Sequence, residues 1–202
     1  MSVRLTPSLA PSRNDTGRTA FCGPTVLSAI TGFPVSRIEA IVHEQRADPA
    51  EARRIIEGTY PEEVASALAV FGYGMDETEC YTHLERKQRP TVWSWMQRPR
   101  SAFAYYILMV HTRSEIHWIC IHGAKICDTH TEGRWVFGAD GPHRGAKMTN
   151  VYRVRKLDEK AIGLELTPKS SGIPGARAVP GLAAWHASAR SSQPIASRSF
   201  NF

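Results

Sequence analysis

The sequence predicts a single α+β domain in which helices come first and an antiparallel sheet follows. Apolar residues recur at helical spacing between positions 22 and 72. After residue 99 this pattern gives way to short β-branched and aromatic runs, which are typical of strands. The chain has 202 residues, of which 42% are hydrophobic, and this is enough for one sizeable core.

Four helices are expected in the first half of the chain. The first begins at Cys22 and ends at Gly32, a residue type that commonly follows helix ends. The second begins near Ser36, because Ser36 and Glu39 have the spacing of a capping box. The remaining two helices are expected over residues 59–72 and 91–97.

Five short strands are expected in the second half, at residues 103–110, 117–122, 125–130, 135–137 and 150–154. We therefore divide the chain into a lead-in (1–13), a folded domain (14–157), and a linker with a tail (158–202). The tail is rich in Pro, Gly and Ser, a composition that favours flexibility.

The charge distribution argues against nucleic acid as a partner. The net charge is +6 and the isoelectric point is near 9.4. However, residues 168–202 contain four basic and no acidic side chains, whereas the other 167 residues contain 21 basic and 19 acidic ones. A nearly neutral domain lacks the basic surface that nucleic acids require. The basic tail is the part that we expect to contact a protein assembly partner.

The sequence also predicts the environment of the protein. The longest uncharged apolar stretch, residues 102–110, falls short of the ~20 residues that a membrane helix needs. Residues 1–17 contain no apolar run of the kind found in secretory signals. We therefore expect a cytoplasmic protein without membrane contact, whose four cysteines are not used for disulfides.

Cys22 is the candidate nucleophile. The N-terminus of a helix favours negative charge, and therefore the thiolate form of a cysteine. Gly23 would allow a substrate to approach the backbone closely, and Pro24 fixes the first helical turn. The alternative is that Cys22 is a small buried apolar residue at the start of a helix.

The candidate base and its orienting acid follow from the register of a hairpin. If Gly123 and Ala124 form a two-residue turn, cross-strand partners have residue numbers that sum to 247. His117 and Asp128 are then diagonal neighbours on one face, close enough for the imidazole to reach the carboxylate. Alternatively, His117 is an ordinary edge residue and Asp128 only caps a turn.

These segments resemble the papain-like cysteine peptidase superfamily, in particular small bacterial and phage members of the double-glycine-leader type. The resemblance rests on three segments: Phe21-Cys22-Gly23-Pro24-Thr25, His117-Trp118-Ile119-Cys120-Ile121 and Lys125-Ile126-Cys127-Asp128-Thr129. It implies a papain-like fold over residues 14–157 and a Cys22–His117–Asp128 triad. It also implies a peptide or protein substrate, covalent acyl-enzyme chemistry and no cofactor or metal. A phage particle becomes a second expected location.

The chain departs from this family at the oxyanion hole. Family members usually carry a Gln about six residues before the cysteine, and position 16 is Thr. Asn14 and Thr19 are the nearest candidates to replace it. Two function classes therefore stay open. The first is a cysteine hydrolase; the second is a papain-like domain retained as a structural or interaction module, for instance in a phage virion.

Other candidate residues are assigned to the core or to solvent. Zinc binding by Cys120, His122, Cys127 and His130 is not expected, because His130 projects from the opposite face of the hairpin. Cys120 and Cys127 are expected in the core, as are Trp93, Trp95 and Met96. His111 is assigned a structural role, and His143 and Arg144 are expected to be solvated.

Overall fold

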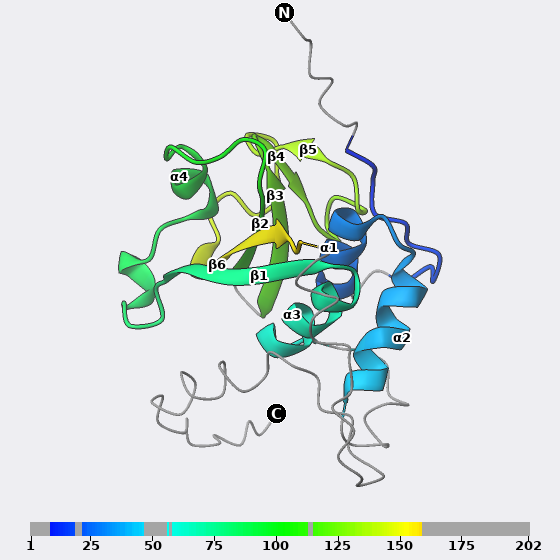
Figure 1. Ribbon diagram of the computed structural model, residues 1–202. Coiled ribbons are helices and arrows are strands. Elements are labelled where there is room, and N and C mark those ends of the chain that lie inside the picture. Colours follow the sequence, from blue (N-terminus) through cyan, green and yellow to red (C-terminus); the bar gives the residue numbers. More distant parts are fainter. Residues whose placement is uncertain (1–8, 19–21, 47–55, 57, 113–114, 159–202) are drawn as a thin grey trace, which may run out of the picture. The chain divides into compact units, whose positions relative to one another are not determined.

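The computed structural model describes residues 9–18, 22–46, 56, 58–112 and 115–158 (Figure 1). In these residues the predicted order, helices followed by an antiparallel sheet, is confirmed. The helices are α1 (Cys22–Thr31), α2 (Val35–Gln45), α3 (Pro61–Val70) and α4 (Val92–Met96), with a short 3-10 helix, η2 (Arg86–Gln88). The strands are β1 (Tyr73–Cys80), β2 (Tyr105–His111), β3 (Ile116–His122), β4 (Lys125–Cys127), β5 (Val136–Phe137) and β6 (Lys147–Lys156). Apart from Asp158, the predicted linker and tail lie outside the described residues.

The six described strands form one sheet in the order β1-β6-β2-β3-β4-β5. Every neighbouring pair in it is antiparallel. The last strand, β6, lies between β1 and β2, and β3 has neighbours on both sides. No helix in the described residues has the length and apolar character that crossing a bilayer requires.

Strand β3 is covered on both faces of the sheet. Trp118 and Cys120 belong to a core cluster with the buried residues of α1, α2 and α3. Ile119 and Ile121 belong to a second cluster that includes α4, which lies apart from the other three helices (Figure 1). Successive side chains of a strand point to opposite faces, so both faces of β3 must be apolar. This burial fixes the register of the strand.

The start of α2 corrects one prediction. The expected capping box between Ser36 and Glu39 does not form; α2 begins at Val35 with Pro34 at the N-cap position, and Pro34 makes no side-chain cap hydrogen bond. Ser36 lies within the first turn, and its backbone N–H donates to Asp15 Oδ1 at 3.0 Å. A tertiary contact therefore uses the residue that the sequence pattern assigned to a local cap.

The third and fourth helices begin with capping boxes. At α3 the Glu63 carboxylate accepts a hydrogen bond from the Tyr60 backbone N–H at 2.8 Å. At α4 the Thr91 hydroxyl oxygen accepts one from the Ser94 backbone N–H at 3.1 Å. Gly72 follows α3 with a φ of 78°, a left-handed conformation that favours glycine. These boundaries agree with the helices predicted over 59–72 and 91–97.

Strand β1 was not predicted from the sequence. This strand carries acidic residues at positions 76, 77 and 79, and Met75 is its one buried side chain. It lies at the edge of the sheet beside β6, where one face is solvated and apolar alternation is not required. The predicted strand at 125–130 is shorter than expected and ends at Cys127, because a turn follows.

Residues 10–13, which we assigned to the lead-in, contact the folded domain. The Trp135 indole N–H donates to the Ala10 carbonyl at 2.8 Å. The Ser12 N–H donates to the Gly133 carbonyl at 2.8 Å. The segment therefore lies along the loop that follows β4.

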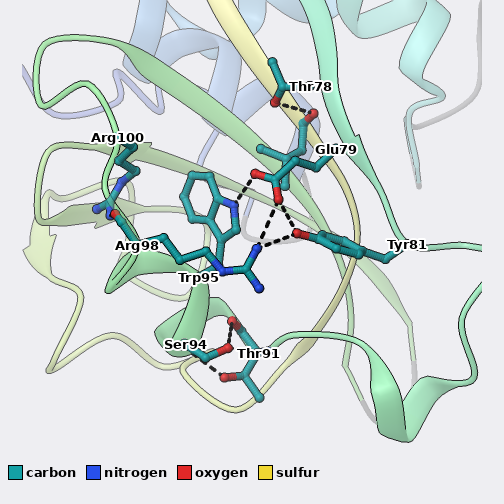
Figure 2. Close-up of polar contacts among 9 residues, drawn as sticks. Thr78, Glu79, Tyr81, Thr91, Ser94, Trp95, Arg98 and Arg100 are labelled. Carbon is teal, nitrogen blue, oxygen red and sulfur yellow. Dashed lines mark hydrogen bonds and ion pairs between the residues drawn. The ribbon is translucent and has the colours of Figure 1, made fainter.

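Glu79 joins β1 to α4 (Figure 2). Its Oε1 accepts a hydrogen bond from the Trp95 indole N–H at 2.6 Å. Its Oε2 accepts hydrogen bonds from the Tyr81 hydroxyl and from Arg98, the latter at 3.2 Å. Trp95 is buried and belongs to the second core cluster. The carboxylate therefore supplies a partner for a polar atom that the core would otherwise leave unsatisfied.

We predict that Glu79→Ala lowers the free energy of unfolding by ~1–3 kcal/mol, because the buried indole N–H loses its acceptor. The matched variant Arg98→Ala should cost no more than ~1 kcal/mol, since this ion pair is partly exposed. Urea unfolding of both variants measures the difference. A larger cost for Arg98→Ala would contradict this account of the contact.

Candidate active site

Cys22 is the first residue of α1 and is partly exposed. Eight of the ten residues of this helix are buried, and the helix packs against β3. Gly23 faces Thr59 so closely that a Cβ at position 23 would lie 2.1 Å from Thr59 Oγ1. Thr59 is held in turn by Trp118, whose indole N–H donates to its carbonyl at 3.1 Å. Tight packing of the helix start therefore fixes the position of the thiol.

The β3–β4 hairpin has the predicted register. Cys120 pairs with Cys127, and His122 pairs with Lys125, across a turn at Gly123 and Ala124. Gly123 has a φ of 56°, as two-residue hairpin turns require. Continued past Cys127, this register brings His117 and Asp128 into contact, with 3.1 Å between His117 Nε2 and Asp128 Oδ2. Both side chains are buried.

Asp128 belongs to a tight turn as well as to this pair. Its Oδ1 accepts a hydrogen bond from the Thr131 backbone N–H at 2.8 Å, and its own N–H donates to Thr131 Oγ1 at 3.0 Å. Burial opposes the charged carboxylate. The hydrogen bond and charge of His117, together with the Thr131 N–H, outweigh burial and lower the pKa of Asp128. The carboxylate is therefore charged and held in one orientation.

His117 lies between Asp128 and Cys22. Burial disfavours its imidazolium form, but hydrogen bonds and charge interactions with Asp128 and Cys22 prevail and raise the pKa of His117 to about 9. Nε2 faces Asp128 Oδ2, which leaves Nδ1 as the second polar atom of the ring. The three residues selected from the sequence therefore form one contiguous set.

Two further histidines lie beside His117. The His143 and His130 rings lie 4.7 and 5.0 Å from the His117 ring, centroid to centroid. His143 Nε2 also lies 3.4 Å from Asp128 Oδ2. Burial and the charges of His117 and His130 lower the pKa of His143, although Asp128 opposes this. His143 was wrongly expected to be solvated, because a Gly/Pro-rich loop carries no sequence signal for the contacts that it makes.

The candidate oxyanion residues are less well placed. Asn14 is exposed, and its Nδ2 donates to the Arg18 carbonyl at 2.7 Å. Its Oδ1 accepts hydrogen bonds from the backbone N–H and the hydroxyl of Thr16. The Asn14 amide is therefore engaged within its own loop. Thr19, the other candidate, lies outside the described residues.

The four residues weighed as zinc ligands do not converge. Cys120 and Cys127 are buried, and burial raises the pKa of both thiols, as expected for core residues. The His122 ring contacts Tyr105 instead, at 4.6 Å between centroids. His130 contacts the other two histidines of the site.

Trp95 and Met96 lie in the core as predicted, whereas Trp93 is partly exposed beneath Arg144.

Comparison with known proteins finds similarity among solved structures. No protein-family model matches the sequence, and no curated protein matches it. Among solved structures, the chain is similar to the peptidase domain of Streptococcus ComA, described as a bi-functional ABC transporter involved in quorum sensing. The identity is 10% and the TM-score 0.44, and the similarity covers 74% of this chain and 100% of that domain. At this level of similarity, function has to be inferred from the side chains themselves.

The pKa of His117 predicts how stability depends on pH. Folding raises this pKa from 6.5 to about 9, so the stabilisation from its partners is complete below pH 6.5 and is lost as the pH rises through 9. The stability advantage of the wild type over His117→Gln should therefore shrink across this range. Urea unfolding of both proteins at pH 6.5 and at pH 9 measures this difference in stability. An advantage that grows with pH would contradict the assigned charge state.

Proposed function

We propose that this protein is a papain-like cysteine hydrolase that cleaves amide bonds in a peptide or protein, with Cys22 as nucleophile, His117 as base and Asp128 as orienting acid. The observation that carries this proposal is the position of the His117 ring, which is hydrogen-bonded to Asp128 at 3.1 Å and whose pKa is raised by its interactions with Asp128 and Cys22. A nucleophile, its base and a third group that orients the base are the components of covalent acyl transfer.

The residues support a two-step reaction. In keeping with its raised pKa, His117 holds the proton of the Cys22 thiol as an imidazolium, and the Cys22 thiolate attacks the substrate carbonyl carbon. The C–N bond breaks, the amine leaves with the proton from His117, and a thioester remains on Cys22. His117 then takes a proton from water, whose oxygen attacks the thioester. The C–S bond breaks, the acid product leaves, and the thiolate and imidazolium are restored.

The surroundings of the triad fit this chemistry. Because Cys22 is partly exposed while His117 and Asp128 are buried, substrate can reach the sulfur but not the orienting pair. A cleft of about 460 Å³, lined in part by Arg86, His111 and His143, opens beside the histidine cluster. The triad does not line this cleft, so we assign it to a part of the substrate away from the scissile bond.

Asp128→Asn tests the orienting role. Asparagine keeps the shape of the side chain but no longer stabilises the imidazolium, so the variant should fold and lose ~10²–10³-fold in kcat/KM. The matched control is Asp140→Asn, at an exposed aspartate, which should keep wild-type activity. Cleavage of a peptide library, followed by mass spectrometry, supplies the assay, with Cys22→Ala as the inactive reference.

Two outcomes would count against the proposal. Cleavage that persists in Cys22→Ala would remove the assigned nucleophile. A wild-type chain that cleaves no peptide in the library, while folding normally, would favour the second function class, a domain retained as an interaction module.

A further inference from the structure

Three imidazole rings converge beside Asp128. The centroid distances are 5.0 Å for His117–His130, 4.7 Å for His117–His143 and 4.5 Å for His130–His143. One ligand nitrogen from each ring lies within 4.8 Å of the other two. The rings come from β3, from the turn after β4 and from the loop before β6, so the tertiary fold brings them together. The proposed hydrolysis uses His117 and leaves the other two imidazoles without a role in its chemical steps.

The polar atoms of this cluster are incompletely satisfied. His143 Nε2 is buried and makes no hydrogen bond in the described residues, although Asp128 Oδ2 lies 3.4 Å away. A buried polar atom without a partner costs ~1–3 kcal/mol. A cation among the three rings would accept the lone pair of this nitrogen.

The donor set indicates which cations would bind. Three neutral imidazoles suit zinc and its neighbours copper, nickel and cobalt, but not magnesium or calcium, which prefer oxygen ligands. With Zn–N distances of about 2.0–2.1 Å, nitrogens on one tetrahedral ion lie ~3.3 Å apart, so the present nitrogens must approach each other by no more than ~1.5 Å. His130 is exposed and is the least buried of the three histidines.

Asp128 provides the supporting contact that such a site needs. Metal-binding histidines usually donate their other ring N–H to a carboxylate, which orients the ring. Asp128 already accepts a hydrogen bond from His117 and lies next to His143. Three histidines with one carboxylate behind them are a common arrangement for zinc with an open fourth position.

We propose that His117, His130 and His143 form a binding site for Zn²⁺ or a related transition-metal ion, and that this ion inhibits the hydrolase by occupying its base. The inhibitory part rests on the proposed function, whereas the binding site does not. On binding, a lone pair of His117 coordinates the metal and any proton on that nitrogen passes to solvent. His117 can then no longer take the proton from Cys22.

Calorimetric titration of the whole chain with Zn²⁺ measures the zinc affinity and so tests the site. His130→Ala and His143→Ala should each weaken zinc binding by more than ~10-fold, the lower limit for loss of a supporting contact. The matched control His83→Ala, at an exposed histidine, should bind zinc like the wild type. Cys22→Ser should also keep wild-type affinity, and its Co²⁺ complex should have the same absorption spectrum as that of the wild type. Circular dichroism verifies that each variant is folded.

The outcomes separate the site from the proposed function. Wild-type zinc affinity in folded His130→Ala and His143→Ala, or loss of binding in Cys22→Ser, would overturn the three-histidine site. If zinc binds as predicted and peptide cleavage is active, zinc should stop cleavage, a chelator should restore it, and cleavage by His130→Ala should resist zinc. Cleavage that zinc leaves unchanged or increases would overturn the inhibition. Zinc binding without any peptide cleavage would support the site and overturn its inhibitory role together with the proposed hydrolase.

Discussion

The two-residue turn at Gly123 and Ala124 sets the β3–β4 register, and this register determines whether His117 can reach Asp128. A shift of one residue would move every side chain of β3 to the opposite face of the sheet. The apolar residues of β3 resist such a shift, because they are buried in two different clusters on the two faces. The same packing that stabilises the sheet therefore positions the polar pair.

Burial gives this pair its electrostatic character. Taking a carboxylate and an imidazole out of water is costly unless each finds a partner. Asp128 finds partners in the Thr131 N–H and in His117, while His117 also interacts with Cys22. The favourable contacts outweigh burial for both residues, so the charged forms are favoured in the interior. His143, whose pKa is lowered, is the neutral neighbour of this charged pair.

Local patterns in the sequence predicted the features that depend on local structure. The helix that begins at Cys22, the helix end at Gly72 and the hairpin register all follow from residue types at fixed spacing.

Features that depend on distant contacts were missed. Strand β1 is acidic and is a strand because it pairs with β6, some seventy residues later in the chain. Ser36 was assigned to a local cap but contacts Asp15, and His143 reaches the site from a loop without periodicity. The catalytic roles of Cys22, His117 and Asp128 remain predictions.

The contact between His117 and Cys22 is the central claim, and the alkylation rate of the thiol tests it most directly. In the wild type at neutral pH, iodoacetamide should modify Cys22 fastest of the four cysteines, as peptide mass spectrometry would show, because Cys22 is partly exposed at a helix N-terminus beside His117, a setting typical of reactive cysteines. Cys80, which is exposed and distant in the sequence, is the internal reference. His117→Gln should slow alkylation of Cys22 by ~10-fold or more and leave Cys80 unchanged. Equal rates for Cys22 and Cys80 in the wild type, or a Cys22 rate that does not respond to His117→Gln, would contradict the account.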